Sequence, residues 1–280
     1  MPLSHANTTC QQKPARAKVI CKWAFACCLA MSGASASAQD TSSSDLAKSL
    51  ANPIAALISV PFQLNYDQGY GSANGNATTL NFQPVVPISL NEDWNVISRT
   101  IVPIKSQTDV AGNSGTQAGL GDTVQSFFFS PKQPTKGGLI WGVGPVLLLP
   151  TSTDSMLGAG EWGIGPTGVA LKQSGPWTYG GLANHIWSLD SNSTVNATFL
   201  QPFLSYTTPD AWTYNINSEA TYDWNSDSWT VPINATIGKV VSIGKQKVQL
   251  TAGAGYYADS PSGGPNGLRG RLVVTYLFPK

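Results

Sequence analysis

The hydrophobic and polar positions of residues 212–224, WTYNINSEATYDW, alternate along the chain. The even positions carry Trp, Tyr, Ile, Ser, Ala, Tyr and Trp, whereas every odd position is polar. Successive side chains of a β-strand point to opposite faces of its sheet. The pattern therefore predicts a strand with two different faces. One face is apolar with aromatic residues at both tips, and the other is polar and carries two carboxylates.

Twelve segments of the chain alternate in this way or end in aromatic residues, and most of them hold 9–14 residues. They are residues 61–69, 78–89, 94–105, 120–130, 139–150, 161–172, 177–188, 195–207, 212–224, 228–241, 246–258 and 268–278. An ordinary strand has about 5–6 residues, whereas a tilted strand that crosses a membrane needs about 9–11. An even number of strands is typical of bacterial single-chain barrels.

The connections between these segments alternate in length. Those after odd-numbered segments are mostly long and rich in glycine and polar residues, and those after even-numbered segments are mostly short. Residues 130–138 form a longer turn, and residues 225–228 a shorter loop, than this pattern requires. Long extracellular loops that alternate with short periplasmic turns are typical of outer-membrane barrels.

Aromatic residues gather at the ends of the predicted strands. Near the short turns lie Trp94, Trp141, Trp177, Trp212, Tyr276 and Phe278, and near the long loops lie Trp162, Trp187, Trp224, Trp229 and Tyr256. Amphipathic rings favour the two membrane–water interfaces. A soluble β-sandwich is the alternative, but its aromatic residues would lie in the core and not at both tips of long strands.

We therefore predict an all-β fold. It is a transmembrane antiparallel β-barrel of about 12 strands, spans residues 61–280, lies in the bacterial outer membrane and is preceded by a short N-terminal helical segment. Composition agrees with this prediction, because 11% of the 280 residues are charged and 41% are hydrophobic. A soluble domain is usually about 25% charged, and no run of about 20 apolar residues in the body of the chain predicts a membrane-spanning helix.

Residues 1–38 have the pattern of a signal peptide. Four basic residues precede or adjoin the apolar run 23–31, and Ala36-Ser37-Ala38 fits the small-residue rule for cleavage. The nine residues of the apolar run are too few for a membrane anchor. A lipoprotein signal is the other alternative, but the residues before Cys27 and Cys28 fit its cleavage box poorly.

Cleavage after residue 38 changes the chemistry that the chain can perform. It removes all four cysteines, four of the 16 basic residues and none of the 15 acidic residues, which leaves a formal net charge of −3. The mature chain then has no thiol for a disulfide, a cysteine metal site or a nucleophile. It has no basic run for nucleic acid. No metal or organic cofactor motif is present, so we expect neither.

Residues 42–63 hold the only convincing helical pattern. Ser42 and Asp45 resemble a capping box, and an Asn-Pro pair can end one helix and begin a second. The apolar residues at helical spacing are Leu46, Leu50, Ile54 and Leu57. We expect residues 39–60 to form either a plug inside the lumen or a periplasmic segment packed against the rim.

Strand parity places five charged side chains on the lumen face, and we predict that they lie along the solute pathway. They are Arg99, Glu219, Asp223, Arg269 and Arg271. Opposed charges across a narrow lumen can form a constriction that orients solutes. The alternative is an ion-pair network that stiffens a mostly closed barrel, because buried charges need partners whatever the function.

His185 is the only histidine after residue 38 and raises the alternative of an outer-membrane lipid-modifying enzyme. Ser188 and Ser205 are available as nucleophiles, but a catalytic serine and histidine need an oriented third group, and the sequence indicates none. Parity places His185 beside Trp187 on the apolar face, which favours a structural role.

Several prolines lie inside the predicted strands, where each removes a donor from the hydrogen-bond ladder. We expect bulges or kinks at these positions, which are Pro84, Pro87, Pro145, Pro166, Pro202 and Pro232. The last predicted strand ends in Phe278, an aromatic ending that is typical of barrels recognised by the outer-membrane assembly machinery, although Pro279 and Lys280 follow it.

Seven stretches together resemble a known family. They are NPIAALISVPFQLNYD (52–67), QPVVPISLNEDWNVISRTIVP (83–103), GLGDTVQSFFFSPK (119–132), IWGVGPVLLLPT (140–151), GPWTYGGLANHIWS (175–188), FLQPFLSYTT (199–208) and YLFPK (276–280). Over nearly all of its mature length the chain resembles the bacterial outer-membrane transporter family that is grouped with the meta-cleavage phenol-degradation pathway proteins. Some members of that family carry the transferred name neuromedin U.

The resemblance implies a barrel in the outer membrane and the passage of small solutes, with aromatic or hydrophobic compounds among them. It supplies no catalytic or binding residues. We predict a channel for passive passage of such solutes, with outer-membrane lipid, the barrel assembly machinery and a small hydrophobic or aromatic solute as partners. The alternatives are a structural or sensing barrel without transport and an outer-membrane lipid-modifying enzyme.

Overall fold

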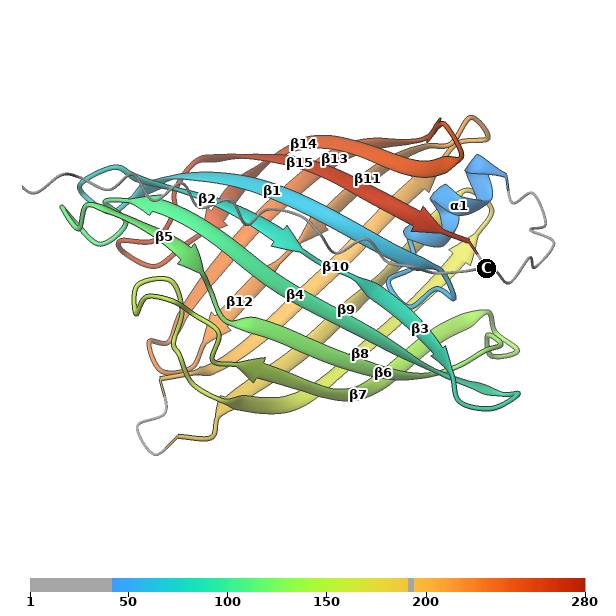
Figure 1. Ribbon diagram of the computed structural model, residues 1–280, viewed down its shortest axis with the longest axis horizontal. Coiled ribbons are helices and arrows are strands. Elements are labelled where there is room, and N and C mark those ends of the chain that lie inside the picture. The colour runs from blue at the N-terminus through green and yellow to red at the C-terminus, as the bar shows by residue number, and fades with distance from the viewer. Residues whose placement is uncertain (1–41, 191–193, 280) are drawn as a thin grey trace, which may run out of the picture. The chain divides into compact units, whose positions relative to one another are not determined.

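The computed structural model describes residues 42–190 and 194–279, and Figure 1 shows their arrangement. One helix, α1 (Ser43–Leu50), precedes the strands. The strand segments are β1 (Ile58–Tyr70), β2 (Gly75–Phe82), β3 (Val85–Ser89), β4 (Trp94–Thr108), β5 (Thr116–Leu120), β6 (Thr123–Pro131), β7 (Leu139–Leu149), β8 (Gly163–Ser174), β9 (Trp177–Ser188), β10 (Asn196–Thr207), β11 (Trp212–Ser218), β12 (Ala220–Asp223), β13 (Ser228–Ile243), β14 (Gln246–Asp259) and β15 (Leu268–Phe278). The predicted signal peptide, residues 1–38, lies outside the described residues.

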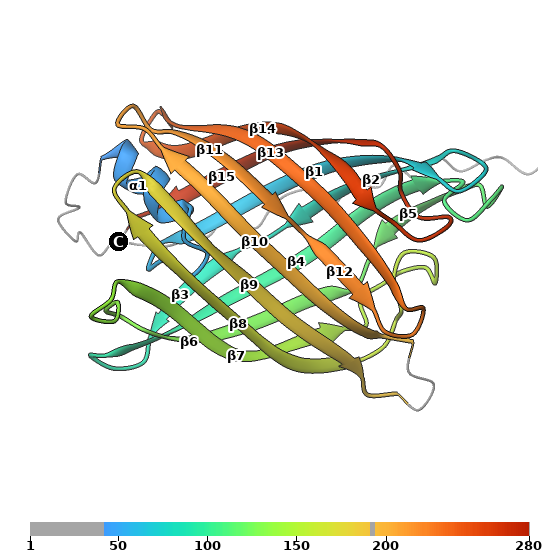
Figure 2. The same cartoon turned by 180° about the vertical axis from the view of Figure 1, so that it is seen from behind.

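The strand segments form one closed antiparallel sheet. Neighbours along the chain pair with each other, β1 pairs with β15, and the pairing of β9 with β10 completes the ring. Three strands are interrupted, so that β2 with β3, β5 with β6, and β11 with β12 are each two parts of one strand. The barrel therefore has 12 strands (Figures 1 and 2), which confirms the predicted fold class.

The strand interruptions have local causes. β2 and β3 keep one register on β4 across Gln83-Pro84, and β11 and β12 keep one register on β13 across Glu219, which lies opposite Pro232. The missing N–H of proline weakens the ladder at both places. β5 and β6 differ by one residue in their register on β4, so the Gly121-Asp122 pair holds a bulge.

The remaining prolines do not all disturb the sheet. Pro145 and Pro166 face each other across β7 and β8. The ladder from β6 to β7 has no pair at Pro145, and the ladder from β8 to β9 has none at Pro166. Pro87 and Pro202 lie in regular pairs. The expectation of a bulge or kink at every in-strand proline is therefore wrong for these two.

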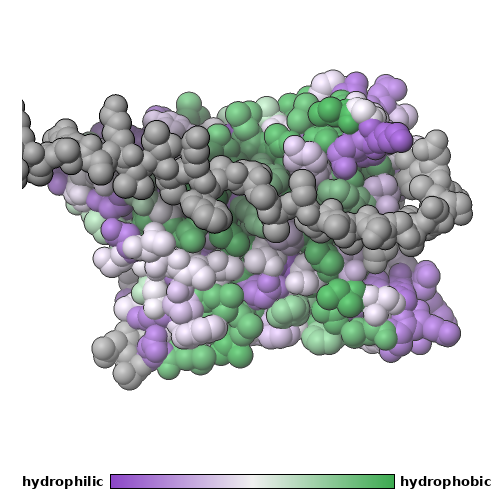
Figure 3. Space-filling model, viewed as in Figure 1, coloured by the Kyte–Doolittle hydropathy of each residue, from purple (hydrophilic) through white to green (hydrophobic). Residues whose placement is uncertain are grey.

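The two faces of the barrel differ as the alternation predicts. Ile216 and Leu272 point outward and are 57% and 56% exposed, whereas Thr213 and Asn234 point inward and are 8% and 1% exposed. Figure 3 shows hydrophobic residues along the middle of the visible face and hydrophilic residues toward its two ends. An apolar outer belt and a polar interior are the arrangement of a lipid-embedded barrel.

Aromatic side chains pack against each other at both ends of the strands. Trp94 and Trp141 lie edge to face with ring centroids 5.9 Å apart near the short turns. Tyr222 packs against both Trp224 and Trp229 with ring centroids 4.9 Å apart, at the end of the barrel that holds the long loops. Such rings anchor a barrel at the two membrane interfaces.

These features make the chain an outer-membrane protein. Within the described residues, no helix is long and apolar enough to cross a membrane. The end of the barrel that holds the short turns, α1 and the end of β15 (Figure 1) is the periplasmic end under the rule for such barrels, and the end with the long loops is the extracellular end.

The helix α1 lies at the periplasmic end and packs on the barrel interior. Ser42 caps it, since its hydroxyl accepts a hydrogen bond from Asp45 N at 3.1 Å. Leu46 and Ala47 are buried against a small cluster that includes Ala211, Val240 and Leu277. The capped first helix is therefore as the sequence predicts.

The second helix suggested by the Asn-Pro pair does not form. Residues 51–57 adopt turns, with Ile54 N donating to Asn52 Oδ1 at 3.0 Å, and β1 already begins at Ile58. The stretch between the cap and the strand is too short for a stable helix, because helix nucleation is costly. Pairing of Ile58 with Phe278 fixes the extended conformation instead.

A charge on the outer face of the barrel tests this assignment of faces. We expect Ile216→Lys to destabilise the barrel by about 2–4 kcal/mol, the cost of a lysine near the bilayer midplane. The neighbouring Asn215→Lys points into the polar interior and should cost much less. Urea unfolding in lipid vesicles measures both, and equal losses would contradict the assignment.

Candidate lumen site

Four charged side chains meet inside the barrel and are here called the charge cluster: Asp67, Glu219, Arg269 and Arg271. Arg271 donates from Nη1 and Nη2 to the two oxygens of Glu219 at 2.8 and 2.7 Å, and from Nε to Asn65 Oδ1 at 2.7 Å. Arg269 Nη1 lies 3.8 Å from Glu219 Oε2. A bidentate arginine–carboxylate pair of this kind combines strength with a fixed orientation.

Asp67 of β1 holds the second arginine of the cluster. Arg269 Nε lies 3.0 Å from Asp67 Oδ1, although its N–H is not directed at that oxygen. The hydroxyl of Tyr257 donates to the same oxygen at 2.6 Å, and the guanidinium of Arg269 lies 5.4 Å from the centre of the Tyr257 ring. Charge pairing and a cation–π contact therefore act on Arg269 together.

Gly255 of β14 provides space that the cluster needs. Glu219 and the two arginines belong to strands separated by β13 and β14, so the arginine side chains must extend over β14 to reach it. Gly255 pairs with both Asn234 and Arg269. A Cβ at Gly255 would lie only 2.5 Å from Asn234 Oδ1 and 2.8 Å from Arg269 Cγ. A larger residue there would displace the arginine.

The charge cluster is mostly removed from solvent. The side chains of Asp67, Arg269 and Arg271 are less than a tenth exposed, and that of Glu219 is one fifth exposed. Transfer of an ion to such a place costs several kcal/mol, and close partners are needed to offset it. The mutual pairing explains how four charges can lie within the barrel.

The five predicted lumen residues do not all meet. Glu219, Arg269 and Arg271 come together in the charge cluster. The side chain of Arg99 on β4 makes no ion pair or hydrogen bond with any residue in the described ranges, and it lines a cavity that Arg271 of the cluster also lines. Asp223, at the end of β12, accepts a hydrogen bond from Asn225 N at 2.8 Å and lies outside the cluster.

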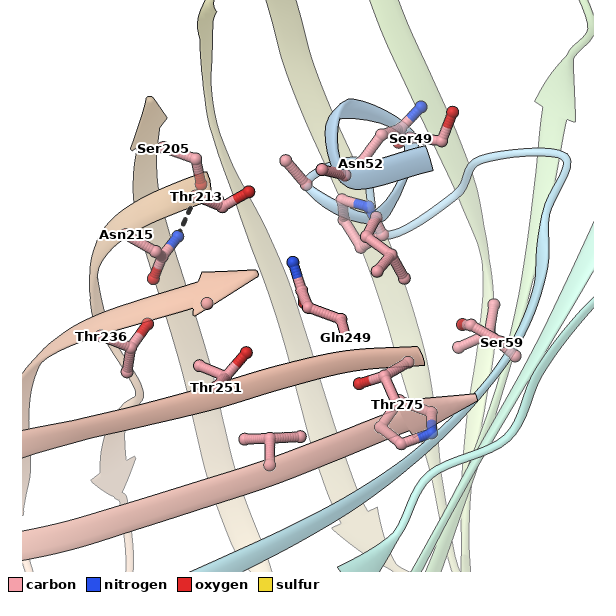
Figure 4. Close-up of a pocket in the computed structure, with 18 of the residues that line it drawn as sticks. Ser49, Asn52, Ser59, Ser205, Thr213, Asn215, Thr236, Gln249, Thr251 and Thr275 are labelled. Carbon is pink, nitrogen blue, oxygen red and sulfur yellow. Dashed lines mark hydrogen bonds between the residues drawn. The ribbon is translucent and has the colours of Figure 1, made fainter. Parts of the chain in front are cut away.

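A cavity of about 260 Å³ occupies the periplasmic half of the lumen. Figure 4 shows Gln249, Thr251 and Thr275 of the barrel wall facing the same space as Ser49 and Asn52 of the N-terminal segment. Hydroxyl and amide side chains from β11 and β13 complete the polar wall, and Asn215 donates to Ser205 Oγ at 2.7 Å. Arg99 and Arg271 are the charged residues that line this cavity.

The N-terminal segment forms one side of this cavity. Ile54 is buried against inward-facing residues that include Ile97, Phe128 and Leu171. Two hydrogen bonds hold α1 to the wall, from Gln173 Nε2 to Lys48 O at 2.9 Å and from Lys247 Nζ to Ser43 Oγ at 3.2 Å. Residues 43–57 therefore pack against the interior and not only on the rim.

The connection between β7 and β8, residues 150–162, covers part of the extracellular end of the lumen. Its Leu157 is 1% exposed, and Leu157 O accepts a hydrogen bond from Lys105 Nζ at 2.7 Å. Gln107 donates to Met156 O at 2.9 Å, and the carboxylate of Asp122 accepts from Ser152 N and Gly160 N.

The structure does not bring His185 to either candidate serine. His185 Nδ1 lies 2.7 Å from Thr198 Oγ1, and the ring packs 4.1 Å from that of Trp187. Ser188 donates to Glu161 Oε2, and Ser205 bonds Asn215 inside the lumen. The hydrogen bond from Ser188, with further ones from Thr194, lowers the pKa of Glu161 in the extracellular connection.

The sequence reasoning missed three members of the site, Asn65, Asp67 and Tyr257. Asn65 and Asp67 follow the same alternation, since they are buried and alternate with the exposed, outward-facing residues Leu64 and Tyr66. That alternation could have placed them on the lumen face. No signal in the sequence predicts that they contact the arginines of the last strand, which follow them by about 200 positions.

Comparison with known proteins supports the fold. No protein-family model and no curated protein matches the sequence. An outer-membrane channel from Pseudomonas putida F1 has a TM-score of 0.63 at 15% identity, over 80% of this chain and 96% of that chain.

Two further solved structures are less similar. Outer membrane phospholipase A from Escherichia coli has a TM-score of 0.47 at 10% identity, over 78% of this chain and 89% of that chain. The translocator domain of the autotransporter NalP from Neisseria meningitidis has a TM-score of 0.44 at 14% identity, over 82% and 92%. The likeness to the Pseudomonas putida channel is one of fold, and the other two carry no functional argument.

Removal of one partner tests the energetics of the charge cluster. We expect Glu219→Gln to lower the free energy of unfolding by about 3–5 kcal/mol, because it leaves the buried Arg271 without a charged partner and Arg269 with Asp67 alone. Asp223→Asn is the matched control on the same strand and should change stability by less than about 0.5 kcal/mol. Urea unfolding in vesicles compares them, and a Glu219→Gln loss as small as the control would contradict the pairing.

Proposed function

We propose that the protein is a passive channel for small solutes across the outer membrane. The observation that carries this proposal is the polar cavity inside the closed barrel. An eight-stranded barrel is just wide enough to be filled by side chains, and 16–18 strands leave an open aqueous channel. A 12-stranded barrel with a cavity in one half of its lumen is intermediate, which suits the slow passage of small molecules.

The proposed pathway runs from the extracellular loops, past the charge cluster and Arg99, through the cavity and out beside the N-terminal segment. Arg99, Glu219, Arg269 and Arg271 form its constriction in this proposal, and Asp223 lies nearer its entrance. A field from fixed charges in a narrow, low-dielectric passage orients and selects solutes. That the Pseudomonas putida structure is described as an outer-membrane channel agrees with this proposal.

We further propose that aromatic or hydrophobic compounds are among the solutes. The family resemblance in the sequence, with its link to phenol degradation, motivates phenolic compounds as the first probes. Apolar side chains of the N-terminal segment and of β3 and β15 line one part of the cavity, where a ring could pack. Insertion by the outer-membrane assembly machinery through the C-terminal strand belongs to the same proposal.

A structural barrel without transport is the second candidate, and the close pairing of the charge cluster favours it. Single-channel conductance of protein purified from outer membranes separates the two functions. We expect discrete ohmic steps in a planar bilayer and partial block by added phenol. An absence of steps, together with uptake of phenol no faster than into protein-free liposomes, would favour the structural barrel.

The plug role of the N-terminal segment can be tested in the same system. We expect deletion of residues 39–57 to raise the single-channel conductance several-fold, because the cavity would then open to the periplasm. Ile54→Asp keeps the chain length but places a charge among apolar partners, and it should raise the open probability. Lys48→Gln, on the helix and half-buried, is the control. Unchanged conductance in the deletion would support a segment that only packs against the wall.

A further inference from the structure

The charges around the lumen cavity do not balance. Three guanidinium groups, those of Arg99, Arg269 and Arg271, face two carboxylates, those of Asp67 and Glu219. Neither carboxylate lines the cavity, whereas Arg99 and Arg271 do. The cavity wall therefore carries an excess of positive charge, and fixed cations in a narrow passage favour anions.

The two arginines at the cavity differ in how far their donors are used. Arg271 has three of its nitrogens engaged by Glu219 and Asn65. The side chain of Arg99 has no hydrogen bond or ion pair with any residue in the described part of the chain, although Glu219 attracts it electrostatically from a greater distance, and it is half-buried at the cavity wall. A guanidinium in this position has its planar set of donors available for a ligand. Its geometry matches the two oxygens of a carboxylate.

The remainder of the cavity suits the body of a small organic molecule. Pro53, Leu57, Val85 and Val273 contribute apolar surface, and Thr236, Gln249 and Thr251 contribute neutral hydrogen-bonding groups. The volume of about 260 Å³ lies near the lower end of ligand pockets in proteins. A large or multiply charged solute would not fit this combination of size and charge.

We propose that this cavity binds small organic monocarboxylates, with the carboxylate on Arg99 and the apolar body against the N-terminal segment. The inference rests on the proposed channel function only in treating the bound carboxylate as a transported solute. Binding itself can be measured without transport. It names the solute class as organic anions, and it assigns to Arg99 the role of the ligand-contacting residue.

Benzoate and benzamide are the probes, because they have nearly the same shape and differ in charge at neutral pH. Isothermal calorimetry on the protein purified from outer membranes in detergent measures their binding directly. We expect benzoate to bind at least about tenfold more tightly than benzamide, as one charged hydrogen-bonding pair provides. Arg99→Gln should remove that preference, and Arg99→Lys should retain part of it.

Lys172→Gln is the matched control, because it removes one positive charge from an exposed side chain outside the cavity. It should leave the preference for benzoate unchanged. The shift in gel mobility on heating, which folded barrels show, verifies that each variant is folded. If Arg99→Gln does not fold, two other variants provide the same test. Arg99→Leu should lose the preference for benzoate over benzamide, and Arg99→Lys should retain part of it.

Equal binding of the two probes to the wild type, no binding of either, or a preference that survives in Arg99→Gln would overturn the inference. In planar bilayers, block by benzoate at lower concentration than benzamide is the matching result for transport. Benzoate binding without any conductance or uptake would leave the carboxylate site in place and refute the channel. Conductance with equal block by both probes would refute the carboxylate site and leave the channel.

Discussion

The structure depends on the requirement that backbone N–H and C=O groups be paired where lipid replaces water. A strand has two edges, and a flat sheet of 12 strands would leave its two outer edges without partners. The pairing of β9 with β10 and of β1 with β15 leaves no such edge within the barrel. The other properties of the molecule follow from this closure, because it separates an outer surface that must be apolar from an inner surface that need not be.

Closure also explains where the sheet tolerates irregularity. Prolines at positions 145 and 166 face each other on adjacent strands, so the ladder gaps that they cause are concentrated in one part of the wall. The break at Glu219 lies opposite Pro232, and Glu219 is the carboxylate that both arginines of β15 approach. The strand interruption at Glu219 thus coincides with the place where the charge cluster lies.

The interior combines paired charges with space that is not filled. The charge cluster offsets the desolvation of its own members, which requires the glycine at position 255 as well as the charged residues. The side chain of Arg99 is not paired with any member of the charge cluster and lines the cavity wall. The N-terminal segment reaches that cavity because Ile54 has apolar partners on the inner face, and these partners are inward-facing residues of strands far away in the chain.

Local patterns in the sequence determined the strands, their two faces and the capped helix. Alternation with period two, or aromatic residues at the ends, identified each of the 12 strands, and parity placed Thr213, Arg269 and Arg271 inside and Ile216 outside, as the structure has them. Ser42 and Asp45 predicted the start of α1. These features depend on interactions between residues close in the chain and on which side of a strand meets lipid, so a single sequence contains them.

Only the tertiary structure decided which inward-facing residues meet. Arg271 contacts Asn65, which precedes it by 206 positions, and Glu219, from which two strands separate it, while Asp223 remains outside the cluster. It also decided that residues 51–57 form turns within the barrel and that Arg99 faces a cavity. These distances are set by the register and the closure of the whole ring, and parity along one strand contains no information about either.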